Sequence, residues 1–257
     1  MILCIDIGNT NVSFLLNHNL SNLRFNLATD RAKTEDEYFF NIASVLNYYK
    51  IDLVKINKIV ICSVVPQLNF VFVNLCKKYF NKSAKILENT DININIDIPN
   101  KNELGMDRLV DSFGSILIAQ EKGYNASLVV DFGTATTFNF SIKKNNTWSY
   151  QGGAICPGIN LSLESLKSAT AKLPRVSFQE CDNILGKNTT DAINSGMFFG
   201  YKSLTEGIIK EFLRLHDNIY VIATGGLSSI ICKNISFVHL VEKDLTLNTI
   251  LKISESI

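Results

Sequence analysis

The stretch ILCIDIGNTNVSFLL, residues 2–16, gives the first indication of the fold. Asp6 interrupts its apolar opening, and residues 8–11 then supply the glycine, amide and hydroxyl side chains that favour tight turns. Apolar residues resume at Val12. This order predicts a buried strand, a turn and a second strand, which together form a β-hairpin with an acid near the end of its first strand.

A second stretch, SLVVDFGTATTFNFSI at residues 127–142, repeats this order. An apolar strand leads to Asp131, and Gly133 follows by two residues, as Gly8 follows Asp6. Asp131 comes 125 residues after Asp6, which is close to half of the 257-residue chain. Two similar units packed face to face, each presenting an acidic hairpin to a shared cleft, would produce this spacing. Chance similarity of two short hairpins is the alternative.

Other apolar patterns predict the elements around the two hairpins. The segment DININIDI, residues 91–98, alternates polar and apolar side chains as a strand does. The expected helices span 34–50, 70–80, a stretch after Gly105, 161–171 and about 190–215, and the expected strands span 58–66 and 218–226. Strands that alternate with helices predict a mixed α/β fold.

The charge balance and the apolar runs of the chain argue against nucleic acid and membranes as partners. The chain has 25 Lys and Arg against 24 Asp and Glu, so it lacks the basic field that drives non-specific nucleic-acid binding. No apolar run approaches the roughly 20 residues of a membrane span, and Asp6 splits an N-terminal run that no Lys or Arg precedes, unlike a signal peptide. Six cysteines without a CxxC pair suggest reduced core thiols. We therefore expect a cytoplasmic protein that binds neither nucleic acid nor membrane.

The first hairpin turn has the chemistry of a phosphate-binding loop. A glycine-containing turn lets backbone N–H groups approach an oligophosphate, and Asn9, Thr10 and Asn11 add side-chain donors. Asp6 could hold the Mg²⁺ that accompanies ATP, usually through water. The alternative is a polar turn in which Asp6 bonds its own backbone. The repeat at Asp131 favours the functional interpretation, and neither a P-loop nor a dinucleotide-binding glycine motif is found.

The segment GMDR, residues 105–108, opens an expected amphipathic helix. Asp107 could accept a proton from a hydroxyl group, and the Arg108 guanidinium could pair bidentately with a carboxylate or phosphate. Stabilisation of the helix dipole by the acid and solvation of the arginine is the alternative. The segment TGG, 224–226, could let a nucleotide approach the backbone closely, although two glycines after a strand are most often a simple turn.

Six segments in order resemble the type III pantothenate kinases, and they cover nearly the whole chain. These are DIGNTN (6–11), GMDR (105–108), DFGTATTF (131–138), GGAICPGI (152–159), GKNTTDAINSG (186–196) and TGG (224–226). The resemblance implies the fold of actin, Hsp70 and the acetate and sugar kinases. That fold has two duplicated actin-like, ribonuclease H-like α/β subdomains, expected here at residues 1–118 and 119–257, with a nucleotide cleft between them.

The resemblance also implies an activity and its partners. It predicts a homodimer that phosphorylates pantothenate with ATP to 4'-phosphopantothenate, the first step of coenzyme A biosynthesis. The expected cofactors are ATP, Mg²⁺ and a monovalent cation, K⁺ or NH₄⁺.

Matching segments carry the family's residue roles to this chain. Asp107 would be the general base, Asp131 would ligate the monovalent cation, and Thr134 would contact ATP. The first phosphate loop would comprise Asp6, Ile7, Gly8, Asn9, Thr10, Asn11, Val12 and Ser13. Pantothenate would contact Gly105, Met106, Asp107, Arg108 and Thr189. Family members often have a tyrosine about ten residues before the arginine of this motif, where this chain has Ile98.

Two other functions are open at this point. A sugar or small-acid kinase could use the same fold, although the GMDR and GKNT segments argue against it. An accessory protein similar to the Bvg accessory factors could keep the fold and bind nucleotide without catalysis. The presence of Asp6, Asp107, Arg108 and Asp131 favours an active kinase.

Overall fold

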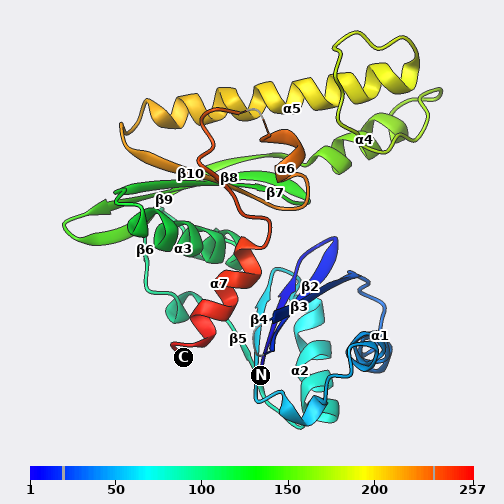
Figure 1. Ribbon diagram of the computed structural model, residues 1–257, viewed down its shortest axis with the longest axis vertical. Helices are drawn as coiled ribbons and strands as arrows, with labels where there is room; N and C mark the ends of the chain where they lie inside the picture. Colours follow the sequence, from blue (N-terminus) through cyan, green and yellow to red (C-terminus); the bar gives the residue numbers. More distant parts are fainter. Residues whose placement is uncertain (19–20, 234) are drawn as a thin grey trace. The chain divides into compact units, whose positions relative to one another are not determined.

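The computed structural model describes residues 1–18, 21–233 and 235–257 (Figure 1). Internal contacts divide the chain into two compact units. Unit 1 contains residues 1–93, 102–113 and 246–257, and unit 2 contains residues 94–101 and 114–245. Each unit is built around one β-sheet. The mixed α/β fold with two sheets agrees with the pattern expected from the sequence.

The sheet of unit 1 contains the first hairpin. Its strands are β1 (Ile2–Ile7), β2 (Asn11–His18), β3 (Ser21–Ala28), β4 (Lys58–Ser63) and β5 (Ala84–Ile86), in the order β3-β2-β1-β4-β5. The first three strands form an antiparallel meander, and β4 and β5 continue parallel to β1. The predicted hairpin is present, with Asp6 opposite Ser13.

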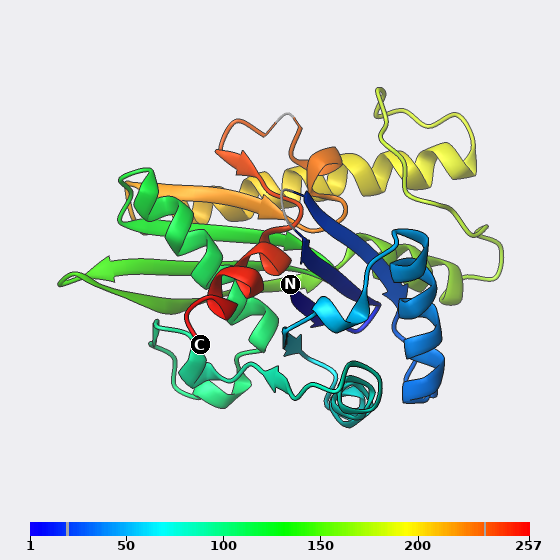
Figure 2. The ribbon, with the colours of Figure 1, turned by 60° about the horizontal axis from the view of Figure 1, so that its bottom comes forward.

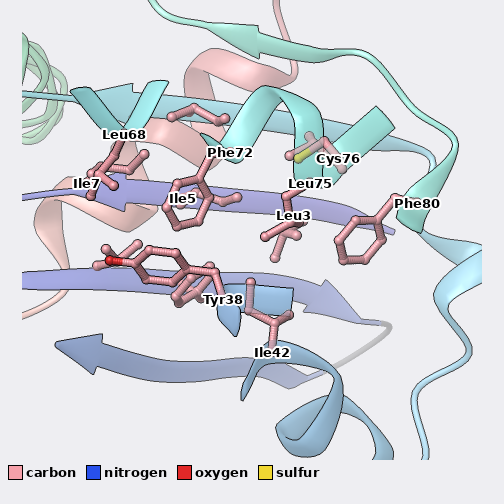
Figure 3. Packing of buried hydrophobic residues seen from close by; sticks show 14 of the residues in the cluster. Leu3, Ile5, Ile7, Tyr38, Ile42, Leu68, Phe72, Leu75, Cys76 and Phe80 are labelled. Atoms are coloured by element: carbon pink, nitrogen blue, oxygen red, sulfur yellow. The ribbon is translucent and has the colours of Figure 1, made fainter. Parts of the chain in front are cut away.

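Two helices cover one face of this sheet, α1 (Glu35–Tyr48) and α2 (Pro66–Phe80). Alternate β1 residues pack against them in an apolar core that includes Leu3, Ile5, Ile7, Tyr38, Ile42, Phe72 and Cys76 (Figure 3). A capping box at Thr34 begins α1. The second helix begins at Pro66 rather than near residue 70, because proline fits the first turn, where its missing N–H costs no helix bond.

The sheet of unit 2 contains the second hairpin and one additional edge strand. Its strands are β6 (Asn95–Ile96), β7 (Ala126–Phe132), β8 (Ala135–Lys144), β9 (Thr147–Pro157), β10 (Ile219–Thr224) and β11 (Leu240–Val241), in the order β11-β10-β7-β8-β9-β6. Of the alternating segment 91–98, only β6 is a strand, and it pairs with β9 at the sheet edge. The rest of that pattern does not form a strand.

Helices cover both faces of the second sheet (Figures 1 and 2). The long helix α5 (Thr189–Leu213) packs on one face through Met197, Phe198 and Ile209. Ile116 and Ala119 of α3 (Met106–Glu121) pack on the other, where Val129 and Ile222 face them. The remaining helices are α4 (Ile159–Ser168), α6 (Ser228–Ile231), α7 (Leu245–Ser254) and the single 3₁₀ turns Leu53–Lys55, Asn89–Asp91 and Lys101–Glu103.

The two sheets have the same plan. In each sheet the first three strands along the chain form an antiparallel meander, β1-β2-β3 or β7-β8-β9. Two further strands, β4 and β5 or β10 and β11, then extend the sheet on the other side of the first strand and run parallel to it. This correspondence confirms the predicted duplication. The expected boundary between residues 118 and 119 stays a prediction. Within the described part of the chain, no helix is both long enough and apolar enough to cross a membrane.

Candidate functional site

The phosphate-binding segment predicted in unit 1 is a tight turn between β1 and β2. The N–H of Gly8 donates to the carbonyl of Asn11 at 3.0 Å, which closes the turn and leaves Asn9, Thr10 and Asn11 exposed. The Thr29 hydroxyl donates to the Gly8 carbonyl at 2.6 Å. Arg31 donates to Asn9 Oδ1 at 2.9 Å. Contacts from the segment after β3 therefore hold a turn whose polar side chains face solvent.

Asp6 lies at the carboxyl end of β1, on the face opposite the apolar core. Its register neighbours are Ser13 on β2 and Cys62 on β4. Ile5 and Ile7 belong to the core cluster, and since strand side chains alternate between faces, Asp6 points to the other side. The side chains of Asp6 and Cys62 form a hydrogen bond.

Asp107 is the second residue of α3, where its carboxylate folds back onto the helix start. The N–H of Arg108 donates to Asp107 Oδ1 at 2.7 Å. A Cβ atom on Gly105 would stand 2.5 Å from the same oxygen, so this conformation requires glycine there. Burial raises the pKa of the Asp107 carboxyl, and the Arg108 N–H and charge oppose that rise only in part.

The charges of Asp6 and Asp107 both act on the thiol of Cys62 in unit 1. Burial raises the pKa of the Cys62 thiol well above its ordinary value, and Asp6, Asp107 and Asp111 raise it further. Asp111 is buried one turn after Asp107, and it accepts a hydrogen bond from Thr246 Oγ1 at 2.6 Å. The charges of Asp6, Asp107 and Asp111 therefore make the electrostatic potential at this buried thiol negative.

The second acidic hairpin lies in unit 2, where Asp131 is the penultimate residue of β7 and pairs with Thr137 of β8 and Thr224 of β10. The turn that follows exposes Gly133 and Thr134. Gly158, which precedes α4, packs closely against the carbonyls of these two residues. The segments that contain Asp131, Thr134 and Gly158 are therefore neighbours, although they are separate in sequence.

The TGG segment also meets Asp131. Gly225 has a positive φ of 89°, and a Cβ atom there would stand 2.5 Å from Asp131 Oδ1 and 2.8 Å from the backbone of Phe132. A side chain at this position would be strained by conformation and blocked by contact. Gly225 thus allows the chain after β10 to lie against the end of β7.

Thr189 lies in another part of unit 2, as the first residue of α5. Its neighbour Asn188 caps the helix by accepting from the Asp191 N–H at 2.9 Å. An exposed hollow surrounds it, lined by Leu173, Gly186, Lys187, Asn188, Thr189, Ala192 and Ile193. This lining includes neither Asp131 nor Thr134. Ile98, where the family often has tyrosine, lies 3.9 Å from the position that a Gly152 Cβ would take.

The donor set suits a cation that is bound mainly by another ligand. Among the described residues, no group of three or more His, Cys, Asp or Glu side chains could hold a metal ion. Mg²⁺ keeps several waters and is commonly bound by one or two carboxylates together with substrate phosphates. Asp6 therefore fits an ion that arrives with a nucleotide.

Three residues near the predicted sites were not expected from the sequence. Thr29 and Arg31 lie directly after β3 and contact the turn at residues 8–11. Cys62 contacts Asp6 from the neighbouring strand β4. Their segments resemble an ordinary loop and an ordinary buried strand. A signal for Cys62 was available in the strand pattern, because a parallel pairing of β1 and β4 brings their carboxyl ends together.

Solved structures of low sequence identity share this fold over nearly the full chain. A Campylobacter jejuni protein described as a Baf family transcriptional activator aligns with a TM-score of 0.60 and 22% identity, covering 99% of this chain and 98% of its own. A ROK family glucokinase from Streptomyces griseus, in complex with glucose and AMPPNP, aligns with a TM-score of 0.54 and 12% identity, covering 99% of both chains. These similarities support the actin-like kinase fold.

Sequence comparison gives a narrower assignment. The type III pantothenate kinase family model matches residues 2–211. Type III pantothenate kinases from Brevibacillus brevis and Halalkalibacterium halodurans are 37% and 38% identical to this chain; the alignments cover 96% of this chain in both cases, and 95% and 96% of the relatives. The chain therefore belongs to the type III pantothenate kinase family.

Proposed function

We propose that this enzyme transfers the terminal phosphoryl group of ATP to the hydroxyl group of pantothenate. The product is 4'-phosphopantothenate, formed in the first step of coenzyme A biosynthesis. The observation that carries the proposal is the identity of 37–38% over 96% of the chain to proteins named type III pantothenate kinase. The chemistry of Asp107 supports the proposal, because this half-buried aspartate at the start of α3 has a carboxyl whose pKa is raised by burial.

Asp107 acts as the general base for the pantothenate hydroxyl. A carboxylate with a raised pKa is a stronger proton acceptor than an exposed one, and its bond from the Arg108 N–H fixes its orientation. Arg108 pairs with the carboxylate of pantothenate or with a phosphate, since guanidinium forms bidentate hydrogen bonds with both. Gly105 and Met106 complete this substrate contact.

The segment from Asp6 to Ser13 binds the phosphates of ATP. Its closed turn offers backbone N–H groups and the exposed side chains of Asn9, Thr10 and Asn11 as donors. Asp6 would hold the Mg²⁺ that accompanies ATP. When bound, Mg²⁺ would offset the charge of the phosphates.

Residues of unit 2 bind the remaining ligands. Asp131 contributes to a site for K⁺ or NH₄⁺, and Thr134 in the following turn contacts ATP. Thr189, exposed at the start of α5, contacts pantothenate. The nucleotide cleft, the homodimer and the cytoplasmic location stay predictions.

A phosphate-transfer assay tests the proposed function. Purified protein is incubated with Mg-ATP and pantothenate, with K⁺ present and then replaced by Na⁺, and 4'-phosphopantothenate is quantified by mass spectrometry. We expect product with K⁺ and much less with Na⁺. A parallel panel contains glucose, other sugars and small hydroxy acids. Product from a sugar alone, or nucleotide binding without any turnover, would overturn the proposal in favour of a sugar kinase or an accessory protein, respectively.

A further inference from the structure

The thiol of Cys62 is a buried polar group in unit 1 that the proposed mechanism does not use. Cys62 is 0% exposed and lies in register with Asp6 on the parallel strand β4. Ile59 and Ile61 of β4 point into the core with Ile5 of β1, so Cys62 and Asp6 share the opposite face. The register therefore places the thiol beside the carboxylate.

The thiol serves as a hydrogen-bond donor rather than as a nucleophile. A thiol with the ordinary pKa of about 8.5 is mostly protonated at neutral pH, and the full burial of Cys62 disfavours the charged thiolate further. A protonated, fully buried thiol is chemically inert. It is a weak donor to a neutral group, but an ionised carboxylate strengthens the hydrogen bond that it accepts.

Two other buried thiols in unit 1 lack this relation. Burial alone raises the pKa of Cys4 and of Cys76 to about 12, with no carboxylate contributing. Cys76 belongs to the apolar cluster between β1 and α2 (Figure 3). Cys62 is thus distinguished from these thiols by its carboxylate neighbour and not by its burial.

We propose that Cys62 is a positioning residue, whose thiol donates a hydrogen bond to Asp6 and holds that carboxylate in the orientation that binds the water shell of Mg²⁺. The inference rests on the role that the proposed function gives to Asp6. A carboxylate at the end of a strand can rotate about two side-chain bonds, and a donor fixed on the neighbouring strand restricts that rotation.

Binding measurements on three variants test the proposal. Cys62→Ala removes the donor, Cys62→Ser keeps a donor of similar size, and Cys76→Ala is the matched control because it truncates an equally buried thiol in the same unit. Calorimetric titrations with ATP are carried out at several Mg²⁺ concentrations. We expect the Mg²⁺ needed for half-maximal ATP binding to rise about three- to tenfold in Cys62→Ala, the loss expected for one hydrogen bond to a charged acceptor. Cys62→Ser and Cys76→Ala should stay within about twofold of the wild type. Equal Mg²⁺ dependence in Cys62→Ala and Cys76→Ala would overturn the inference.

Infrared spectroscopy tests the hydrogen bond without nucleotide or pantothenate. The difference spectrum between wild type and Cys62→Ala isolates the S–H stretching band of Cys62, and a hydrogen bond shifts this band to lower frequency. In Asp6→Ala the band should move to the frequency of a thiol that donates no bond. An unmoved band would overturn the inference. Failure of the proposed function is distinguishable, because it would appear as missing pantothenate phosphorylation while the infrared result remained valid.

Discussion

The two acidic hairpins each place an acid one residue before the end of the first strand, but they differ in turn length and in the neighbours of the acid. Asp6 lies between Ser13 and Cys62, and the corresponding positions around Asp131 are Thr137 and Thr224. The flanking residue on the antiparallel strand is a hydroxyl in both units. On the parallel strand, Cys62 donates to the acid, while the Thr224 hydroxyl donates to the Lys243 carbonyl at 3.4 Å.

The two acids of the duplicated fold can therefore have different roles. Backbone pairing sets where each acid lies, and the residue on the adjacent parallel strand sets what contacts it. In unit 2 the chain after β10 also packs on Asp131 through Gly225, and the Thr29 contact holds the turn in unit 1. We therefore expect the two acids to respond differently to the same substitution.

Asp107 lies outside the two hairpins, and its substitution should reduce turnover more than any other change considered. Asp107 is the second residue of α3, the helix that follows the strands of the first sheet. The helix that follows the strands of the second sheet is α7, and its second residue is Thr246. The proposed proton-accepting role therefore has no counterpart at the start of α7. Asp107→Asn should lower kcat about 10²- to 10⁴-fold, as expected for loss of a general base. Steady-state kinetics with pantothenate measures this, and near-normal turnover would show that another group accepts the proton.

The raised pKa of Asp107 also predicts a pH dependence. Only the ionised carboxylate accepts a proton, so the rate should fall on acidification through a pKa above the ordinary 3.8. The stability of the fold should change with pH in the opposite direction to the rate. Because the pKa of Asp107 is higher in the folded than in the unfolded state, its protonated form stabilises the fold below pH 3.8, and this stabilisation is lost as the pH rises through the folded-state pKa. At pH 7, Asp107→Asn should therefore melt no lower than the wild type. A lower melting temperature would mean that the ionised group stabilises the fold.

Exchanging each strand-end acid for its amide separates the two roles directly. Asp6→Asn should raise the Mg²⁺ requirement, and Asp131→Asn should raise the K⁺ requirement, each by about 10- to 100-fold as for other disrupted ion sites. Each variant serves as the control for the other, since both remove one charge from the same position of a duplicated hairpin. The readout is the initial rate as a function of each cation. Identical cation profiles for the two variants would contradict the assignment of different roles.

Adjacent glycines in unit 2 test how closely the turn packs on Asp131. Gly225→Ala should lower the free energy of unfolding by about 1 to 3 kcal/mol, because alanine is strained at a φ of 89° and its Cβ would meet Asp131 and Phe132. Gly226→Ala is the matched control, since a Cβ there meets no described atom within 4 Å. Denaturant unfolding measures both. An equal decrease in the free energy of unfolding for both variants would show that the contact with Asp131 does not explain the requirement for glycine at position 225.

Much of this arrangement could be predicted from the sequence because it depends on local patterns. The run up to Asp6 and its copy up to Asp131 have the alternation and turn residues of hairpins, and both hairpins form. The segment 91–98 has a similar alternation, but most of it does not pair, because alternation gives a strand only where a partner edge is available. Contacts between segments distant in sequence, such as those of Cys62 with Asp6 and of Gly225 with Asp131, depend on strand order and register, which local patterns do not specify.

The hydrogen bond from Thr29 to the first turn should make only a small contribution to ATP binding. Thr29→Val removes the hydroxyl that donates to the Gly8 carbonyl at 2.6 Å and keeps the shape of the side chain. A net contribution of about 1 kcal/mol for such a bond corresponds to a rise of about two- to fivefold in KM for ATP, with kcat nearly unchanged. Ser44→Ala is the control, because it removes a hydroxyl that donates to a helix carbonyl on α1 at 2.8 Å. If Thr29→Val lowered kcat and left KM unchanged, the turn would stabilise the transition state and would not contribute to nucleotide binding in the ground state. The turn after Asp6 and the turn after Asp131 would then differ in their contribution to catalysis.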